Sequence, residues 1–187
     1  MVRDIGKVLI ALALACGSLS GLALAIEVGE SAPDFDLTDM KGVDHSLSTY
    51  VGHPTLLVFL SCSDGTSRSV APLIQSDLLN PYSSRGLKVL GIDCQGSTME
   101  QMTEFWHDTG VDFPLLMDGE GVLDDYGLIV VSLVLVDGGG VVRYISSGQG
   151  GQAYDRDSVV SVLEGVLREA ASSKVSTWGL IKGLYSD

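Results

Sequence analysis

Two cysteines are the residues of this 187-residue chain with the most evident chemistry. Cys62 follows an apolar run over 55–61, and Cys94 ends a second run over 89–93. Both runs are typical of buried strands. A thiolate can attack a disulfide, but it forms at neutral pH only where a helix N-terminus or a nearby cation lowers the thiol pKa from about 8.5. The elements around the two cysteines therefore decide what they can do.

Hydrophobic periodicity predicts alternating strands and helices. Strands are expected near 34–37, 55–61, 87–93, 114–117, 131–137 and 141–146. One helix is expected over 67–83 with Pro72 inside it, and a second from Ser97, capped with the help of Glu100, to about Thr109. A last helix begins at Asp157 and buries Val159, Val160, Leu163, Val166 and Leu167. The alternation predicts an α/β fold in which helices cover both faces of the sheet.

Several segments match a known pattern in the right order. Residues 29–42 read GESAPDFDLTDMKG, and matching stretches follow at 47–59, 86–93, 113–118, 126–127 and 131–144. The ordered set resembles the thioredoxin-like redoxin superfamily, which includes TlpA/ResA-type thiol-disulfide oxidoreductases and peroxiredoxins. The resemblance covers residues 27–168 and implies a thioredoxin-like fold with a mixed central sheet.

The active-site motif of that superfamily is degenerate here. Its Cys-x-x-Cys belongs where the first core strand meets its helix, and the matching residues are Asp64, Gly65, Thr66 and Ser67. Asp64 cannot form a mixed disulfide and is expected to cap the helix instead. Arg68 could orient Asp64 or an anionic substrate, or could simply face solvent. The peroxiredoxin motif P-x-x-x-T-x-x-C also lacks its proline and its cysteine.

A second departure concerns the loop that closes the site. Disulfide reductases of this superfamily have a cis-proline there, and the nearest position in this chain is Val131. Because cis peptide bonds are rare without proline, the loop is expected to be all-trans.

Cys62 and Cys94 remain as candidates for catalysis. In the implied fold their strands are adjacent and parallel, so both thiols should emerge at the carboxyl edge of the sheet, with Cα atoms within about 7 Å. They could form a stabilising disulfide, remain as two buried free thiols, or act as a working redox pair.

Neither a metal nor a cofactor is expected. His45, His53 and His107 are scattered, and Cys62 has no second thiol four residues on. The acidic residues Asp118, Glu120, Asp124 and Asp125 are expected to form a turn without the spacing of a calcium loop. The formal net charge of −13 makes nucleic acid an improbable partner.

The N-terminus predicts export. Arg3 and Lys7 precede an uncharged run over 8–26, and Ala23 and Ala25 suit a leader-peptidase site before Ile26. An uncleaved membrane anchor over 8–26, or lipidation of Cys16, are the alternatives. The expected organisation is a leader or anchor over 1–25, a redoxin domain over 26–171 and a tail over 172–187, whose apolar residues could dock.

Two functions remain open at this stage. The first is an extracytoplasmic enzyme that exchanges thiols and disulfides through Cys62 and Cys94, with a protein or small thiol as substrate. The second is a redox-inactive binding or scaffold module of the cell envelope, whose former active-site edge holds a protein partner.

Overall fold

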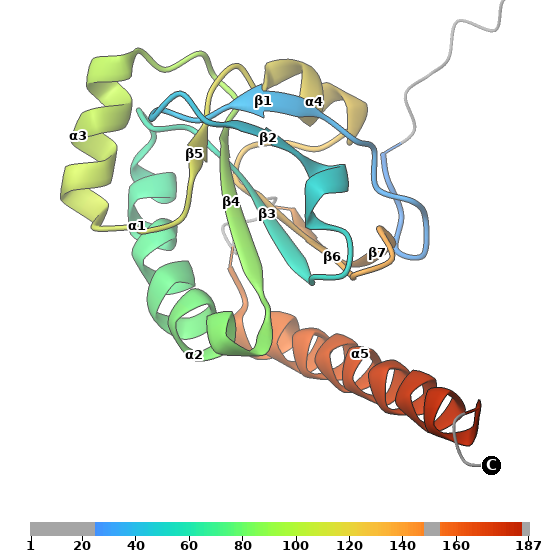
Figure 1. Ribbon diagram of the computed structural model, residues 1–187. Coiled ribbons are helices and arrows are strands. Elements are labelled where there is room, and N and C mark those ends of the chain that lie inside the picture. The colour runs from blue at the N-terminus through green and yellow to red at the C-terminus, as the bar shows by residue number, and fades with distance from the viewer. Residues whose placement is uncertain (1–24, 148–153, 185–187) are drawn as a thin grey trace, which may run out of the picture.

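A five-stranded mixed sheet forms the centre of the molecule. The computed structural model describes residues 25–147 and 154–184. The strand order is β5-β4-β3-β6-β7 (Figure 1), with bounds β3 Thr55–Leu60, β4 Lys88–Asp93, β5 Leu115–Leu116, β6 Ser132–Val136 and β7 Val142–Ser147. β4 runs parallel to β3 and β5, whereas β6 is antiparallel to β3 and β7 is antiparallel to β6. The predicted α/β thioredoxin-like fold with a mixed sheet is confirmed.

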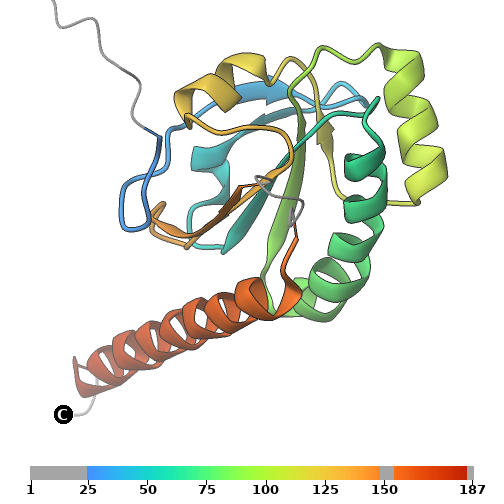
Figure 2. The same cartoon turned by 180° about the vertical axis from the view of Figure 1, so that it is seen from behind.

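Helices cover both faces of this sheet (Figures 1 and 2). On one face, α1 (Gly65–Ile74), α3 (Met99–Thr109) and α5 (Arg156–Leu184) pack on the even-numbered residues of β3. On the other face, η1 (Leu47–Tyr50) and α4 (Glu120–Asp125) pack on the odd-numbered residues. β3 is fully buried as a result, which explains why its sequence is apolar throughout rather than alternating.

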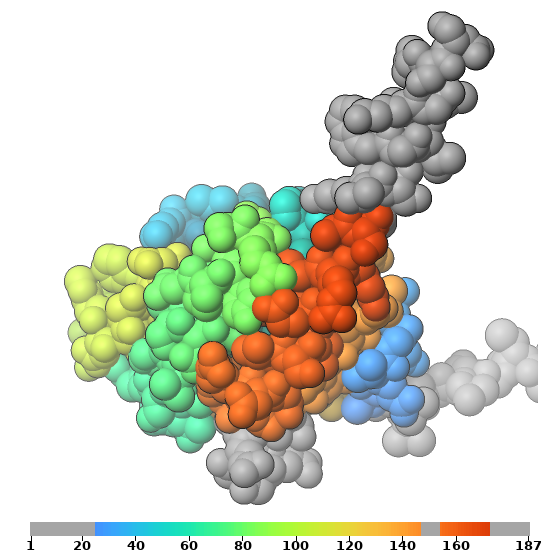
Figure 3. Space-filling view, turned by 90° about the horizontal axis from the view of Figure 1, so that it is seen from below, coloured from blue at the N-terminus to red at the C-terminus, as the bar shows by residue number. Residues whose placement is uncertain are grey.

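The long helical segment after β3 changes its winding along its length. α1 contains Pro72, and it continues through the π-helical η2 (Gln75–Leu79), α2 (Asn80–Tyr82) and the 3-10 helix η3 (Ser83–Arg85). Gly86 ends the segment with φ 102°, a value that glycine adopts without strain. Seen from below in Figure 3, this segment lies beside α5, and Arg85 binds Glu164 across the contact at 2.6 Å.

Three local predictions differ from the structure. The cap of α3 is Thr98, paired with Gln101, rather than Ser97 with Glu100, because Ser97 bonds elsewhere. The last helix, α5, begins at Arg156 rather than at Asp157. The Asp155 carboxylate before it accepts hydrogen bonds from the N–H groups of Asp157 and Ser158. Residues 120–125 form α4 rather than a turn, because Val122 and Tyr126, one helical turn apart, are both buried.

Helix α5 crosses the boundary that was expected at residue 171. Its backbone remains helical to Leu184, whereas the sequence predicts a separate tail from Ser172. Four of the five residues predicted for its buried face, Val159, Leu163, Val166 and Leu167, are buried, and Val160 is half-buried.

A small hairpin outside the main sheet depends on one buried carboxylate. β1 (Asp36–Thr38) pairs with β2 (Asp44–Ser46), and Asp39 lies in the turn between them. Its carboxylate accepts hydrogen bonds from the N–H groups of Lys41 and Val43, and it lies 3.2 Å from Nε2 of His45. Burial alone would raise the Asp39 pKa, but these three partners outweigh burial and hold the pKa below the usual 3.8.

The first prediction concerns the pH dependence of this hairpin. Because the Asp39 pKa is lower in the folded protein than in the unfolded chain, the carboxylate stabilises the fold above about pH 3.8, and this stabilisation is lost as the pH falls through the folded pKa. We expect Asp39→Asn to lower the free energy of unfolding by roughly 1–3 kcal/mol at pH 7, and by much less at pH 3. Denaturant unfolding at both pH values measures this difference. Asp36→Asn, at an exposed position of the same hairpin, is the control, and an equal loss at both pH values for Asp39→Asn would contradict the prediction.

Candidate functional site

The junction between β3 and α1 lies at the carboxyl edge of the sheet. Asp64 is the N-cap of α1, as predicted, and its carboxylate accepts a hydrogen bond from the N–H of Ser67 at 2.8 Å. The Ser67 side chain is buried, and its hydroxyl accepts a hydrogen bond from the N–H of Ser61 at 3.1 Å. These two residues therefore fix the start of the helix to the end of the strand, and neither offers a sulfur.

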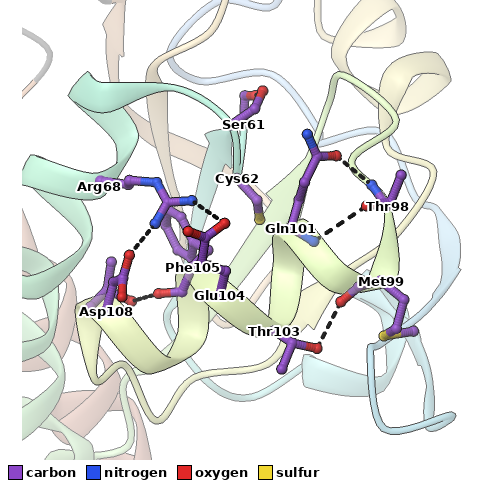
Figure 4. Close-up of polar contacts among 12 residues, drawn as sticks. Ser61, Cys62, Arg68, Thr98, Met99, Gln101, Thr103, Glu104, Phe105 and Asp108 are labelled. Atoms are coloured by element: carbon purple, nitrogen blue, oxygen red, sulfur yellow. Dashed lines mark hydrogen bonds and ion pairs between the residues drawn. The ribbon is translucent and has the colours of Figure 1, made fainter.

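Arg68 connects α1 to α3 (Figure 4). Its guanidinium lies 2.5 Å from the Asp108 carboxylate, 3.6 Å from Glu104, and 5.8 Å from the centre of the Phe105 ring. Both acidic partners belong to α3. The structure thus shows a role for Arg68 that was not among those considered: it holds α1 and α3 together.

Cys62 and Cys94 lie on opposite faces of the sheet. Leu60 of β3 is in register with Asp93 of β4, so the same register places Cys94 beside Ser61 rather than beside Cys62. Successive side chains of a strand point to opposite faces, and the core contacts agree. Cys62 packs with the even-numbered β3 residues, and Cys94 packs with Leu57 and Phe59. Figure 4 shows the Cys62 sulfur directed toward α3.

Of the alternatives considered for these two cysteines, the structure shows two buried free thiols rather than a disulfide. The strands are adjacent and parallel as expected, but adjacency fixes only the edge at which they end. The register decides the face, and here it directs the two side chains to opposite faces of the sheet.

The surroundings of both thiols oppose thiolate formation. Burial, followed by the charge of Asp93 and a hydrogen bond to its carboxylate, raises the pKa of the Cys62 thiol to about 12, although Arg68 and Ser97 act in the opposite direction. Burial and the charge of Asp93 likewise raise the pKa of the Cys94 thiol to about 12. The catalytic role considered for this pair remains a prediction, and neither thiol has the exposure or the low pKa that exchange requires.

Asp93 organises this edge, although it was not among the predicted site residues. It is 1% exposed, and one carboxylate oxygen accepts hydrogen bonds from the Cys62 N–H at 3.0 Å and the Ser97 hydroxyl at 2.7 Å. The other oxygen accepts from the Ser97 N–H at 2.7 Å. The sequence does contain a signal for this role, because Asp93 directly follows the apolar run 89–92. A carboxylate at the end of a buried strand needs several hydrogen-bond donors.

The loop before β6 corrects a second expectation. The peptide bond between Val130 and Val131 is cis, whereas the sequence predicted an all-trans loop. That prediction used only the local preference of a non-proline bond, and the loop is also fixed by tertiary contacts. Val131 is buried in the core, and the Ser132 hydroxyl donates to the Ile129 carbonyl. The Ile129 side chain remains exposed at the carboxyl edge.

Two further expectations concern metals and membranes. Within 25–147 and 154–184, no cluster of three or more His, Cys, Asp or Glu side chains could hold a metal ion. His45 contacts Asp39 and the Tyr50 hydroxyl.

In the same described ranges, no helix has both the length and the apolar character needed to cross a bilayer. The leader, the anchor over 8–26 and Cys16 lie outside the described residues, apart from Ala25 and Ile26.

Comparison with known proteins gives consistent matches. The model of the AhpC/TSA family matches residues 28–145. The thiol-disulfide oxidoreductase ResA of Geobacillus kaustophilus is 31% identical over 126 residues, which cover 66% of this chain and 71% of that protein. The thioredoxin-like protein YneN of Bacillus subtilis is 27% identical over 128 residues, which cover 67% of this chain and 74% of that protein.

Solved structures show the same fold at lower identity. The thioredoxin domain of a thiol-disulfide oxidoreductase from Bacteroides vulgatus superposes with a TM-score of 0.66 at 19% identity, covering 76% of this chain and 99% of that one. A thioredoxin-family thiol:disulfide interchange protein from Chlorobium tepidum gives a TM-score of 0.63 at 17% identity, with the same coverage of both chains.

The second prediction is that both core thiols are slow to react in the folded protein. With a pKa of about 12, each thiol is ionised to only about one part in ten thousand at pH 8. We expect alkylation by iodoacetamide, mapped by peptide mass spectrometry, to modify Cys62 and Cys94 at least about a hundredfold more slowly in the native protein than in urea. Rapid labelling of either residue under native conditions would show that the thiol is accessible and activated.

Proposed function

Because the chain belongs to the AhpC/TSA family and has the thioredoxin-like fold of its redox-active relatives, we propose that it retains their binding edge without their thiol chemistry. The proposed function is that of a redox-inactive binding module of the cell envelope, which holds a protein partner at the carboxyl edge of the sheet. One observation carries the proposal: the N-terminus of α1 is capped by the Asp64 carboxylate, where catalysis would require a thiolate.

The electrostatics of the helix end explain why this substitution is well tolerated. The N-terminus of α1 carries unpaired N–H groups and the positive end of the helix dipole, both of which stabilise an anion. In a redoxin these groups lower the pKa of the attacking thiol. Here Asp64 uses the same groups as a cap, so the helix end is stabilised but has no nucleophile.

We infer that Cys62 and Cys94 do not replace the missing pair. A resolving thiol must reach the same substrate sulfur as the first thiol, whereas Cys62 and Cys94 lie on opposite sheet faces. Exchange through Cys62 and Cys94 would therefore require the sheet edge to rearrange, and the bonds of Asp93 to both adjacent loops oppose this.

The carboxyl edge has the features of a binding surface. Two large apolar side chains, Met99 at the start of α3 and Ile129 before β6, are exposed there by 47% and 42%. Met99 lies after the end of β4, and Ile129 lies before the start of β6, at the same sheet edge as Asp64. Exposed apolar side chains on loops at one sheet edge suit a protein partner, which can cover them with apolar groups of its own.

The third prediction is that the chain does not reduce insulin, and that restoring two cysteines restores part of the exchange. We expect the purified chain to give no turnover above the uncatalysed rate. Asp64→Cys combined with Ser67→Cys should give measurable turnover, because the helix N-terminus would again activate a thiol. Turnover by the unmodified chain that is lost in Cys62→Ser would instead favour the enzymatic alternative.

Two single variants serve as matched controls for that experiment. Asp64→Cys alone should accumulate a mixed disulfide, because it has no partner thiol to release the substrate. Ser67→Cys alone should remain inactive, because position 67 is buried. Circular dichroism of each variant establishes that the fold is intact before activity is compared.

The fourth prediction concerns location. We propose that the chain is exported, since the uncharged run over 8–26 follows Arg3 and Lys7. Mass spectrometry of the protein from its native host should find an N-terminus at Ile26, or the intact chain in the membrane fraction if 8–26 is retained as an anchor. Loss of membrane attachment in Cys16→Ser would indicate lipidation. Full-length protein in the cytosol would contradict all three forms of export.

A further inference from the structure

The first described residues of the chain are bonded to the domain along their length. The N–H of Gly29 donates to the Val142 carbonyl at 2.8 Å, and the N–H of Val142 donates to the Glu30 carbonyl at 2.9 Å. We call residues 25–32 the N-terminal strap; it is drawn in blue beside β7 in Figure 2. The first residues of a domain are poorly ordered unless bonds of this kind hold them, so the strap is a fixed part of the fold.

The strap begins against the end of α4. The N–H of Ile26 donates to the Tyr126 carbonyl at 3.0 Å, and the half-buried Ile26 side chain packs on the core cluster that contains Tyr126. The backbone of Ala25 lies directly against Gly127, because a Cβ added to Gly127 would lie only 2.6 Å from the Cα of Ala25. The peptide bond between Ala25 and Ile26 is therefore covered on one side by the chain that follows α4.

This peptide bond is the one at which the sequence predicts removal of a leader. Its hydrolysis adds water across the bond: Ala25 keeps the carboxylate, and the nitrogen of Ile26 becomes an ammonium. A peptidase binds its substrate as an extended segment and must enclose both sides of the bond that it cuts. Although Ala25 is exposed as a residue, the contact with Gly127 leaves only one side of its backbone accessible.

We propose that the closed strap protects the bond between Ala25 and Ile26, so that a leader peptidase cuts it only before the strap closes or while the strap is locally open. This inference rests on the proposed export of the chain and adds to it the order of two events. A chain that is cut first loses its leader, whereas a chain that folds first keeps residues 8–26 as an anchor. Both forms can close the strap, because the ammonium of Ile26 still has a hydrogen to donate to the Tyr126 carbonyl.

Hydrogen exchange tests the strap without any peptidase. In the ¹⁵N-labelled full chain, kept in a mild detergent, we expect the Ile26 amide to exchange at least about tenfold more slowly than in a synthetic peptide of residues 18–34. Gly127→Ala should remove most of this protection, because the added Cβ would displace Ala25.

Gly110→Ala is the matched control for that variant. Gly110 has φ 64° and Gly127 has φ 60°, so alanine brings similar backbone strain at both positions. Nothing lies within 4 Å of a Cβ added to Gly110, so this variant should leave the exchange of the Ile26 amide unchanged. Circular dichroism establishes that both variants are folded.

Cleavage by a purified leader peptidase tests the bond itself. Mass spectrometry of products that begin at Ile26 should show the folded full chain to be cut at least about tenfold more slowly than the peptide of residues 18–34. Gly127→Ala should be cut several-fold faster than Gly110→Ala, since the rate follows the population of the open strap. If Gly127→Ala does not fold, the comparison of the unmodified chain with the peptide still decides.

The outcomes separate this inference from the proposed export. If the peptide is cut and the folded chain is cut equally fast, the strap does not protect the bond, and the inference is overturned while the export stands. The same conclusion follows if folded Gly127→Ala changes exchange and cleavage no more than Gly110→Ala does. If the peptide is not cut after Ala25, the predicted leader site is wrong and the inference falls with it.

Discussion

The carboxyl edge of the sheet depends on the buried carboxylate of Asp93. Its oxygens hold the loop after β3 through Cys62 and the loop after β4 through Ser97, and its backbone carbonyl accepts a hydrogen bond from Gly119 before α4. Three connections that are far apart in the sequence thus meet at one residue. A carboxylate is costly to bury unless its oxygens are bonded, so its partners are as necessary as the residue itself.

The same residue also weakens the thiol chemistry of the chain. Its negative charge adds to burial in raising the pKa of both Cys62 and Cys94, because a thiolate next to a carboxylate is disfavoured. Arg68 reduces this effect on Cys62, but its guanidinium is largely paired with Asp108 and Glu104. The arrangement that makes the edge rigid is therefore also the one that keeps the nearby thiols protonated.

Much of the fold was predictable from the sequence, and the failures share a physical origin. The apolar runs locate the long strands, and Asp64 is recognisable as a cap, because both signals are local. The cap of α3 was displaced by one residue because the Ser97 hydroxyl donates to Asp93, a contact across the structure that leaves Thr98 to cap the helix. A disulfide was considered because topology places Cys62 and Cys94 at one edge of the sheet. The sheet face to which each side chain points depends instead on the strand register. The cis bond before Val131 likewise departs from a local rule in a loop fixed by tertiary contacts.

The exchange of a thiol for a carboxylate at the N-terminus of α1 changes what a partner can sense. A cysteine thiolate at a helix N-terminus loses its charge when it is oxidised to a disulfide. The Asp64 carboxylate stays on its cap bond to Ser67 whatever oxidant surrounds it, and the two buried thiols lie behind the strand ends rather than at the surface. A partner that docks at this edge therefore meets the same charge and the same shape under oxidising and reducing conditions. Such constancy supports the proposed binding function, since the affinity of this edge for a partner would not vary with the redox state of the surroundings.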